Sequence, residues 1–351
     1  MQHTHTFEKP FVTESGAVIP QPRAAWRSWG KLNQARDNAV VIFHALTGNC
    51  EADRWFGGLF GPGGVLNPAG SPDSPGRFVL CINVPGSCYG SSGPRTVNPH
   101  TGEPWRASFP EITIRDMVCF QQRVLDLLEI TGVELAVGGS MGGMQVLEFC
   151  LMDRRARAGV VLAAGAAHSP WAVALNHTQR LAITGDPSWR GGDYPEDDPP
   201  RRGLSLARQI AMNSYRAPSD YRRKFGRERR SDGRFQVESY LEYQGDKLCR
   251  RFDAVSYLRL SRAMDSHDVG RGRGGLADAL SRVQIPVLVA GVSSDGLYPA
   301  EEQRELASLL PRGQYTEIDS PHGHDAFLIE FGKMNQIIAS FLENQTLESQ
   351  T

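Results

Sequence analysis

The chain has 351 residues, a length that corresponds to about two domains of ordinary size. Hydrophobic residues make up 40% and charged residues 22% of it, which excludes a disordered or fibrous chain. The 38 basic and 39 acidic side chains nearly cancel, so the formal net charge of -1 excludes a surface that binds nucleic acid by overall positive charge.

Three features of the sequence predict the cellular compartment of the protein. No run of about 18 apolar residues occurs, so we expect no membrane-spanning segment. The N-terminus lacks the apolar core of a secretory signal. No two of the six cysteines are closer than seven positions, which excludes CxxC motifs and predicts free thiols in a reducing compartment. We therefore expect a cytoplasmic protein.

Short apolar runs rich in β-branched residues recur along the chain and predict strands. They span residues 40–46, 78–84, 134–137, 159–163, 285–290 and 315–318. Between the second and third runs, residues 113–130 carry apolar side chains at helical spacing on one face. Near-continuous apolarity is typical of strands that are buried on both faces. Strands that alternate with helices predict the α/β class, with a mostly parallel central sheet between layers of helices.

This pattern breaks off between residues 167 and 280. Residues 189–200 have the composition of a loop, and polar helical stretches surround them. Residues 222–234 hold seven Arg or Lys side chains, which is typical of a solvated helical face; alternatively, they assist a negatively charged cofactor such as a coenzyme A ester. We therefore predict a catalytic α/β domain of residues 1–166 and 281–351, interrupted by a helical lid domain of residues 167–280.

A G-x-S-x-G motif centred on Ser140 follows the third predicted strand directly and opens a helix. This context is typical of a nucleophilic serine on a tight strand-to-helix turn. Glycines flank the serine because its backbone is strained and the strand and helix approach closely. The alternative is an ordinary glycine-rich turn with an exposed serine. We predict that Ser140 is a catalytic nucleophile.

A serine nucleophile needs a base and an acid that orients the base, which follow it in the order Asp, then His, in this architecture. Asp295 lies in the loop just after the fifth predicted strand, where such an acid is expected. Asp265 and Asp268 are rival acids, but they lie before that strand. His322 and His324 both follow the last strand, and spacing alone does not separate them. The neighbouring glycine and the apolar helical stretch after it favour His324.

The oxyanion formed during acyl transfer needs two backbone N–H donors. Met141, directly after the nucleophile, is one candidate. Leu46, in the loop of residues 44–49 after the first predicted strand, is the other. We expect His44 at the start of this loop to have a structural, hydrogen-bonded role.

Three further segments are less specific. Residues 83–94 are rich in small side chains and follow the second strand, which puts them beside the site. Residues 265–275 combine Asp, His, Gly and Arg, but their spacing fits no familiar metal signature, and without aromatic residues they are weak evidence for RNA binding. Residues 61–76 form a surface loop rich in Gly, Pro and Ser.

Several segments together resemble the homoserine O-acetyltransferases of the α/β-hydrolase superfamily, over residues 40–331. The matching segments are HALTGN, NVPGSCYGSSGP, FPEITIRDMV, GGSMGGMQVLEF, FQVESYLEYQGDK, RFDAVSYLRLSRAMDSHDVGRGRGG, SSDGLYP and GHDAFL. The resemblance implies an α/β-hydrolase fold with an inserted helical lid. It also implies a triad of Ser140, Asp295 and His324, which resolves the choice between the two histidines.

The resemblance further implies how substrates bind. Leu46 and Met141 correspond to the oxyanion donors, Arg208 and Tyr215 to residues that hold the amino-acid substrate, and Asp325 to the acid that binds its ammonium group. The expected reaction transfers an acetyl group from acetyl-CoA to L-homoserine by a ping-pong route, in methionine biosynthesis. Acetyl-CoA is then a substrate, and neither a permanently bound cofactor nor a metal is expected. The family also implies a homodimer through the lid helices, without nucleic-acid or membrane partners.

The sequence departs from the family pattern close to the acyl site. The family often has Gly-Gly-Cys where this chain has residues 86–88, and Ser-Ser-Ile where it has residues 95–97. Transfer of a succinyl group therefore stays open, as does serine as the acceptor, because one methylene is worth only about 1–3 kcal/mol of discrimination. A plain esterase or thioesterase and a non-catalytic, hydrolase-like interaction protein are the alternatives from other functional classes.

Overall fold

The protein is described by a computed structural model that covers residues 1–61, 63–70 and 76–348. The predicted loop of residues 61–76 therefore lies partly outside the described residues. Within this coverage no helix is long and apolar enough to cross a membrane. The six cysteines are free thiols, as their spacing predicted.

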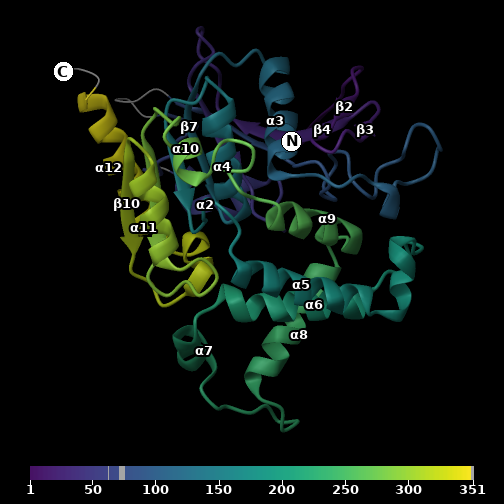
Figure 1. The fold of residues 1–351 in the computed structure, drawn as a ribbon. Coiled ribbons are helices and arrows are strands. Elements are labelled where there is room, and N and C mark those ends of the chain that lie inside the picture. Colours follow the sequence, from purple (N-terminus) through teal and green to yellow (C-terminus); the bar gives the residue numbers. More distant parts are fainter. Residues whose placement is uncertain (62, 71–75, 349–351) are drawn as a thin grey trace.

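An eight-stranded sheet forms the centre of the molecule (Figure 1). Its strands, in spatial order, are β1 (His3–Thr6), β4 (Arg23–Trp29), β6 (Phe78–Ile82), β5 (Ala39–Phe43), β7 (Val133–Gly139), β8 (Gly159–Leu162), β9 (Val287–Val292) and β10 (Gly313–Ile318). From β6 to β10 all neighbours pair in parallel, whereas β4 pairs antiparallel with both β1 and β6. Two short strands, β2 (Phe11–Val12) and β3 (Val18–Ile19), pair separately. The prediction of a mostly parallel α/β sheet is confirmed.

Every predicted strand is present, but β1 to β4 were not predicted. The His-Thr repeat of β1 offers no apolar run, and its residues are largely exposed, so local hydrophobicity gives no signal there. The strand predicted from residue 285 begins only at Val287. Pro286 precedes it because proline has no N–H to donate to the ladder, although its carbonyl still accepts from Gly159 N at 3.0 Å.

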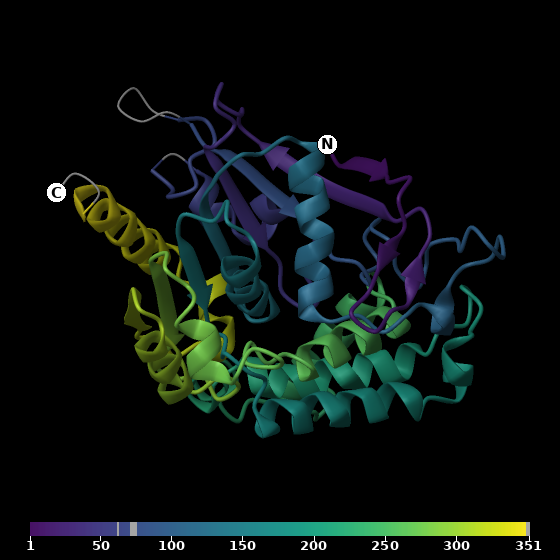
Figure 2. The same ribbon diagram turned by 45° about the horizontal axis from the view of Figure 1, so that its top comes forward.

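Helices cover both faces of the sheet (Figure 2). Along β5, Val41 and Phe43 pack into one core and Val40 and Ile42 into a second, because side chains alternate between the faces of a strand. The first core includes α3 (Ile114–Leu127), α4 (Met141–Met152) and α11 (Ala300–Leu309), and the second α1 (Ala52–Trp55), α2 (Gly57–Phe60) and α12 (Phe331–Glu348). The predicted helix at 113–130 is confirmed as α3, which begins after a capping box formed by Thr113 and Asp116.

The segment between β8 and β9 is helical and lies beyond the carboxyl ends of the strands (Figure 1). It contains α5 (Pro170–Thr184), η2 (Pro187–Gly192), α6 (Arg201–Tyr215), α7 (Pro218–Phe225), α8 (Gln236–Cys249), α9 (Ala254–Asp265) and α10 (Leu276–Leu280). We call α5 to α9 the inserted helices. That residues 167–280 form a domain of their own stays a prediction.

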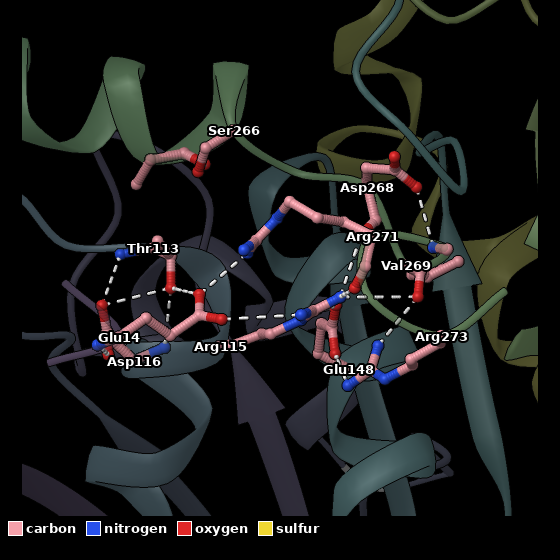
Figure 3. A network of polar contacts seen from close by, with 12 residues as sticks. Glu14, Thr113, Arg115, Asp116, Glu148, Ser266, Asp268, Val269, Arg271 and Arg273 are labelled. Carbon is pink, nitrogen blue, oxygen red and sulfur yellow. Dashed lines mark hydrogen bonds and ion pairs between the residues drawn. The ribbon is translucent and has the colours of Figure 1, made fainter. Parts of the chain in front are cut away.

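A buried ionic network ties the end of the inserted helices to α4 (Figure 3). Glu148 of α4, only 1% exposed, pairs with Arg115 at 3.0 Å and with Arg273 at 2.7 Å. Arg115 also donates to the carbonyl oxygens of Asp268 and Arg271, at 3.1 and 2.8 Å. Residues 265–275, with the sequence DSHDVGRGRGG, therefore connect the inserted helices to α4. Acids of the same chain pair with arginines of this segment.

Candidate active site

The backbone at Ser140 is strained, as predicted for a serine on a tight strand-to-helix turn, and the residue is only 6% exposed. Ser140 lies between β7 and α4 with φ 57° and ψ -127°, a conformation that a non-glycine residue adopts only when its surroundings enforce it. The surroundings are tight. A Cβ at Gly142 would lie 2.1 Å from the carbonyl oxygen of Phe43, and one at Gly138 2.6 Å from the backbone of Gly142. The glycines of the motif therefore allow β5, β7 and α4 to meet behind the serine.

Asp295 and His324 lie at the same edge of the sheet, after β9 and β10. His324 Nδ1 and Asp295 Oδ2 are 2.8 Å apart, and both side chains are buried. The other carboxylate oxygen accepts hydrogen bonds from the amides of Leu297 and Tyr298, at 2.8 and 3.0 Å. The acid is thus fixed by backbone donors, and it in turn fixes the imidazole.

The second histidine has a different environment. His322 is partly exposed, and its Nδ1 lies 3.0 Å from Asp220 Oδ1 of α7. The rival acids are also occupied, since Asp265 pairs with Arg180 and Asp268 accepts from the amide of Gly270. Among these candidates, the structure brings only Asp295 and His324 together.

The electrostatics at His324 suit a general base. Burial alone would lower the pKa of the imidazole, but the charge of Asp295 and its hydrogen bond outweigh burial and raise the pKa above its ordinary value. The negative charge of Asp325 acts in the same direction. The protonated form of His324 is therefore stabilised, which is what a general base requires.

The two backbone amides predicted as oxyanion donors have no hydrogen-bond acceptor in the described part of the chain. Met141 is the first residue of α4, where the amide has no acceptor within the helix. Leu46 lies in the loop after β5, and in the described part of the chain its amide makes no hydrogen bond. Gln145 holds this loop, because its side-chain amide donates to the carbonyl of His44 at 3.1 Å.

His44 is structural, as the sequence predicted. Its side chain is completely buried, and burial lowers its pKa to about 4, so that the ring is neutral. Nδ1 lies 2.9 Å from the carbonyl oxygen of Ala45, and Nε2 accepts from the amide of Val84 at 3.1 Å. The ring thereby joins the loops after β5 and β6.

The residues assigned to the amino-acid substrate approach the triad from α6 and η3 (Gly323–Leu328). The guanidinium of Arg208 lies 5.2 Å from the ring centre of Tyr215, whose ring in turn lies 5.7 Å from that of His324. Arg208 makes no ion pair with any residue that the structure describes. The ring of Tyr215 therefore lies in contact range of both this unpaired cation and His324.

Asp325 follows the base directly and pairs with Arg216, whose Nε is 3.1 Å from Oδ2. Burial raises the pKa of Asp325, although the positive charges of Arg216 and Arg208 oppose this shift. Arg216 also binds Asp220 at 3.2 Å. Two cations, Arg216 and Arg208, therefore act on the acid that directly follows His324.

Comparison with known proteins places the chain in a family. The model of the α/β-hydrolase fold matches residues 38–331. Homoserine O-acetyltransferases from Chlorobium luteolum and Salinibacter ruber are each 46% identical, over 97% of this chain and 93% and 98% of theirs. One from Nostoc punctiforme is 45% identical over 94% of this chain and 92% of its own. The chain belongs to the homoserine O-acetyltransferase family.

Solved structures show how widely this fold is shared. The homoserine O-acetyltransferase of Bacillus anthracis aligns with a TM-score of 0.89 at 23% identity, covering 97% of both chains. That of Staphylococcus aureus aligns at 0.75 and 29% identity, covering 97% of this chain and 95% of its own. An acetylester hydrolase from Corynebacterium glutamicum reaches 0.86 at 24% identity, covering 98% and 96%. The fold alone therefore does not separate transfer from hydrolysis.

In this member of the homoserine O-acetyltransferase family, sequence reasoning missed two residues that lie next to His324 or contact its neighbour. Tyr298 is fully buried, and its ring centre lies 5.2 Å from that of His324. Its hydroxyl lies 3.2 Å from Nδ1 of His168, whose Nε2 accepts from Asn176 at 3.1 Å. Burial lowers the pKa of His168 to about 4, so the ring is neutral and Nδ1 carries the proton that it donates to Tyr298. The sequence signal was present, because Tyr298 belongs to the SSDGLYP segment that also holds Asp295, but no role was assigned to it.

Proposed function

We propose that the chain transfers an acetyl group from acetyl-CoA to L-homoserine, through an acyl-Ser140 intermediate, in methionine biosynthesis. The observation that carries the proposal is the unpaired Arg208 above Tyr215, next to the buried Asp295–His324 pair. A hydrolase that acts on simple esters needs the pair but has no use for a carboxylate-binding cation beside it. An acyltransferase with an amino-acid acceptor needs both.

In the first half-reaction His324 accepts the proton of the Ser140 hydroxyl while the serine oxygen attacks the thioester carbonyl. The carbonyl oxygen becomes an oxyanion, which the amides of Leu46 and Met141 stabilise. The C–S bond then breaks, the thiolate of CoA takes the proton from His324, and the acetyl group stays on the serine. Asp295 keeps the imidazole in the required tautomer and stabilises its positive charge.

In the second half-reaction homoserine binds where CoA sulfur has left. The guanidinium of Arg208 binds the carboxylate of homoserine, and Asp325 binds its ammonium group. The ammonium group then replaces part of the ion pair between Asp325 and Arg216. His324 takes the proton of the side-chain hydroxyl, and the resulting oxygen nucleophile attacks the acyl-serine. The product ester leaves, and the proton returns to Ser140.

Transfer must be faster than reaction with water. The inserted helices lie over the carboxyl ends of the strands, where they exclude solvent and orient the acceptor (Figure 1). The scheme requires no permanently bound cofactor and no metal, because the thioester is already activated and the protein supplies the base and the oxyanion donors.

The inserted helices also fit a homodimer interface. Leu181 of α5, Leu206 of α6 and Tyr243 of α8 are large apolar side chains that are about half exposed, at 55%, 47% and 56%. Large exposed apolar patches are typical of protein contacts. We propose that two copies associate through these helices in the cytoplasm, where the free thiols stay reduced; light scattering in solution tests the dimer.

A two-by-two assay tests the reaction. Acetyl-CoA and succinyl-CoA are each offered with homoserine and with serine, and the products are identified by mass. We expect O-acetylhomoserine as the main product and no turnover by Ser140→Ala. Rapid hydrolysis of acetyl-CoA that does not depend on the acceptor would favour a thioesterase. Succinyl transfer or acylated serine would change the substrate assignment, and full activity of Ser140→Ala would refute the nucleophile.

A further inference from the structure

A pocket of about 250 Å³ lies where the loop after β6 meets the inserted helices. Arg95 and Arg106 line it from the loop side, and Arg201 and Arg250 from the ends of α6 and α8. No residue of the triad lines it. The mechanism above therefore gives this group of four arginines, which we call the arginine pocket, no role.

The charges of the arginine pocket are available to an anion. Arg201 and Arg250 form no ion pair within the described part of the chain. Arg95 and Arg106 pair with Glu196 and Asp193, but these acids are 78% and 71% exposed, and such surface pairs are weak and exchange readily. The pocket also lies at the N-terminal end of α6, whose dipole favours negative charge. Four cations around one cavity fit a ligand with several phosphate groups.

Most of the remaining wall of the arginine pocket is apolar, and its two acids are already engaged: Glu196 pairs with Arg95, and Asp253 accepts a hydrogen bond from the hydroxyl of Tyr194 at 2.7 Å. Tyr194, Phe252 and Val255 are buried side chains that line it, together with Leu204 and several prolines. A flat heterocyclic base can pack against such walls while its phosphates meet the arginines. This combination of cations and apolar surface matches a phosphorylated adenine nucleotide.

The arginine pocket is connected to the oxyanion site. Arg251, between the pocket residues Arg250 and Phe252, donates to the carbonyl oxygen of Thr47 at 2.6 Å. Thr47 follows the oxyanion donor Leu46 directly. On the other side, Arg201 precedes Arg208 by seven residues on α6, a distance of about 10 Å along the helix. The pantetheine arm of CoA spans this separation.

We propose that the arginine pocket binds the 3′-phosphoadenosine diphosphate end of the acyl donor, with Arg201 and Arg250 as its main phosphate ligands. This inference rests on the proposed function, because it takes an acyl-CoA as the donor. The basic run at 222–234 has no such role. There Arg229 donates to the carbonyl oxygen of Gly233, and Arg234 pairs with Asp232 and Glu242.

The test compares two donors with the double variant R201A/R250A. Acetyl-CoA carries the nucleotide end, and S-acetylpantetheine lacks it. We expect the KM for acetyl-CoA to rise about 10- to 100-fold, since two charge-assisted phosphate contacts are lost. The KM for S-acetylpantetheine and both kcat values should stay within about twofold of wild type. Arg201→Lys with Arg250→Lys should restore most of the affinity for acetyl-CoA.

The controls separate this proposal from others. R229A/R230A in the basic run should leave both KM values unchanged; a selective rise for acetyl-CoA in that variant, and not in R201A/R250A, would overturn the assignment. So would equal effects of R201A/R250A on both donors. If the wild type hydrolyses acetyl-CoA without making O-acetylhomoserine, the proposed acceptor is wrong. The KM values can then still be measured from the release of CoA, and they still test whether the arginine pocket binds the nucleotide. If the wild type turns over no acetyl-CoA, calorimetric titration with CoA tests the arginine pocket instead. Equal affinity of the wild type and R201A/R250A for CoA would then refute the proposal.

Discussion

The candidate site has two halves that are held in different ways. Ser140, Asp295 and His324 follow β7, β9 and β10, so the hydrogen-bonded sheet and backbone donors fix them. Arg208 and Tyr215 lie on α6, where their positions depend on contacts between half-buried side chains. The backbone thus places the candidate catalytic groups, whereas side-chain packing places the candidate recognition groups. The recognition half should therefore tolerate change without loss of the fold or of the acylation step.

The largest effect on activity is expected from a change among Ser140, Asp295 and His324, which the sheet holds in place. Asp295→Asn should lower kcat by about 10⁴-fold, because the amide neither fixes the required tautomer of His324 nor stabilises its positive charge. Steady-state release of CoA measures this, and circular dichroism should show an unchanged fold. A loss of less than tenfold would mean that another acid orients the base.

The second prediction concerns the ionic network around Glu148, which links α4 to the end of the inserted helices. Glu148→Ala should lower the free energy of unfolding by about 3–5 kcal/mol, because it leaves Arg115 and Arg273 without their buried counter-ion. Urea denaturation measures the change. Glu242→Ala, which breaks an exposed pair with Arg234, is the matched control and should have no measurable effect. Equal stability of the two variants would show that the network of Figure 3 does not anchor the inserted helices.

The third prediction isolates the recognition half. Arg208→Leu should raise the KM for homoserine about 10- to 100-fold, since a hydrogen bond to a charged group contributes about 1.5–3 kcal/mol. The burst of CoA release that reports acylation of Ser140 should be unchanged. Arg208→Lys should recover part of the affinity, because it keeps the charge but not the planar pair of donors. Loss of the burst would place Arg208 in the first half-reaction.

The smallest effect is a shift in the pH profile. Because the pKa of His324 is raised and the neutral ring is the base, kcat/KM should fall as pH drops through that pKa, about tenfold per pH unit below it. Asp325→Asn removes a negative charge that raises the same pKa, so the acid limb should move to lower pH. An acid limb that does not move, or that moves upward, would contradict the arrangement of these charges.

Local residue patterns were enough to predict much of the fold. Apolar runs located the central strands, the flanking glycines located Ser140, and the positions after two strands indicated Asp295 and a histidine. These features are local, because a strand, a tight turn or a helix start depends on neighbouring residues. The exposed edge strand β1 was missed for the same reason, since its pairing with β4 depends on a partner about 20 residues away.

Which side chains meet depends on how distant parts of the chain pack together. Spacing did not separate His322 from His324, whereas their contacts with Asp220 and Asp295 do, across 102 and 29 residues. The pairing of Arg216 with Asp325 and the arginine pocket likewise join segments that are distant in the chain. A side chain reaches such partners only after the chain has packed, and many pairings are compatible with one local pattern. Local sequence therefore located the strained turn at Ser140, and packing brought Asp295 to His324.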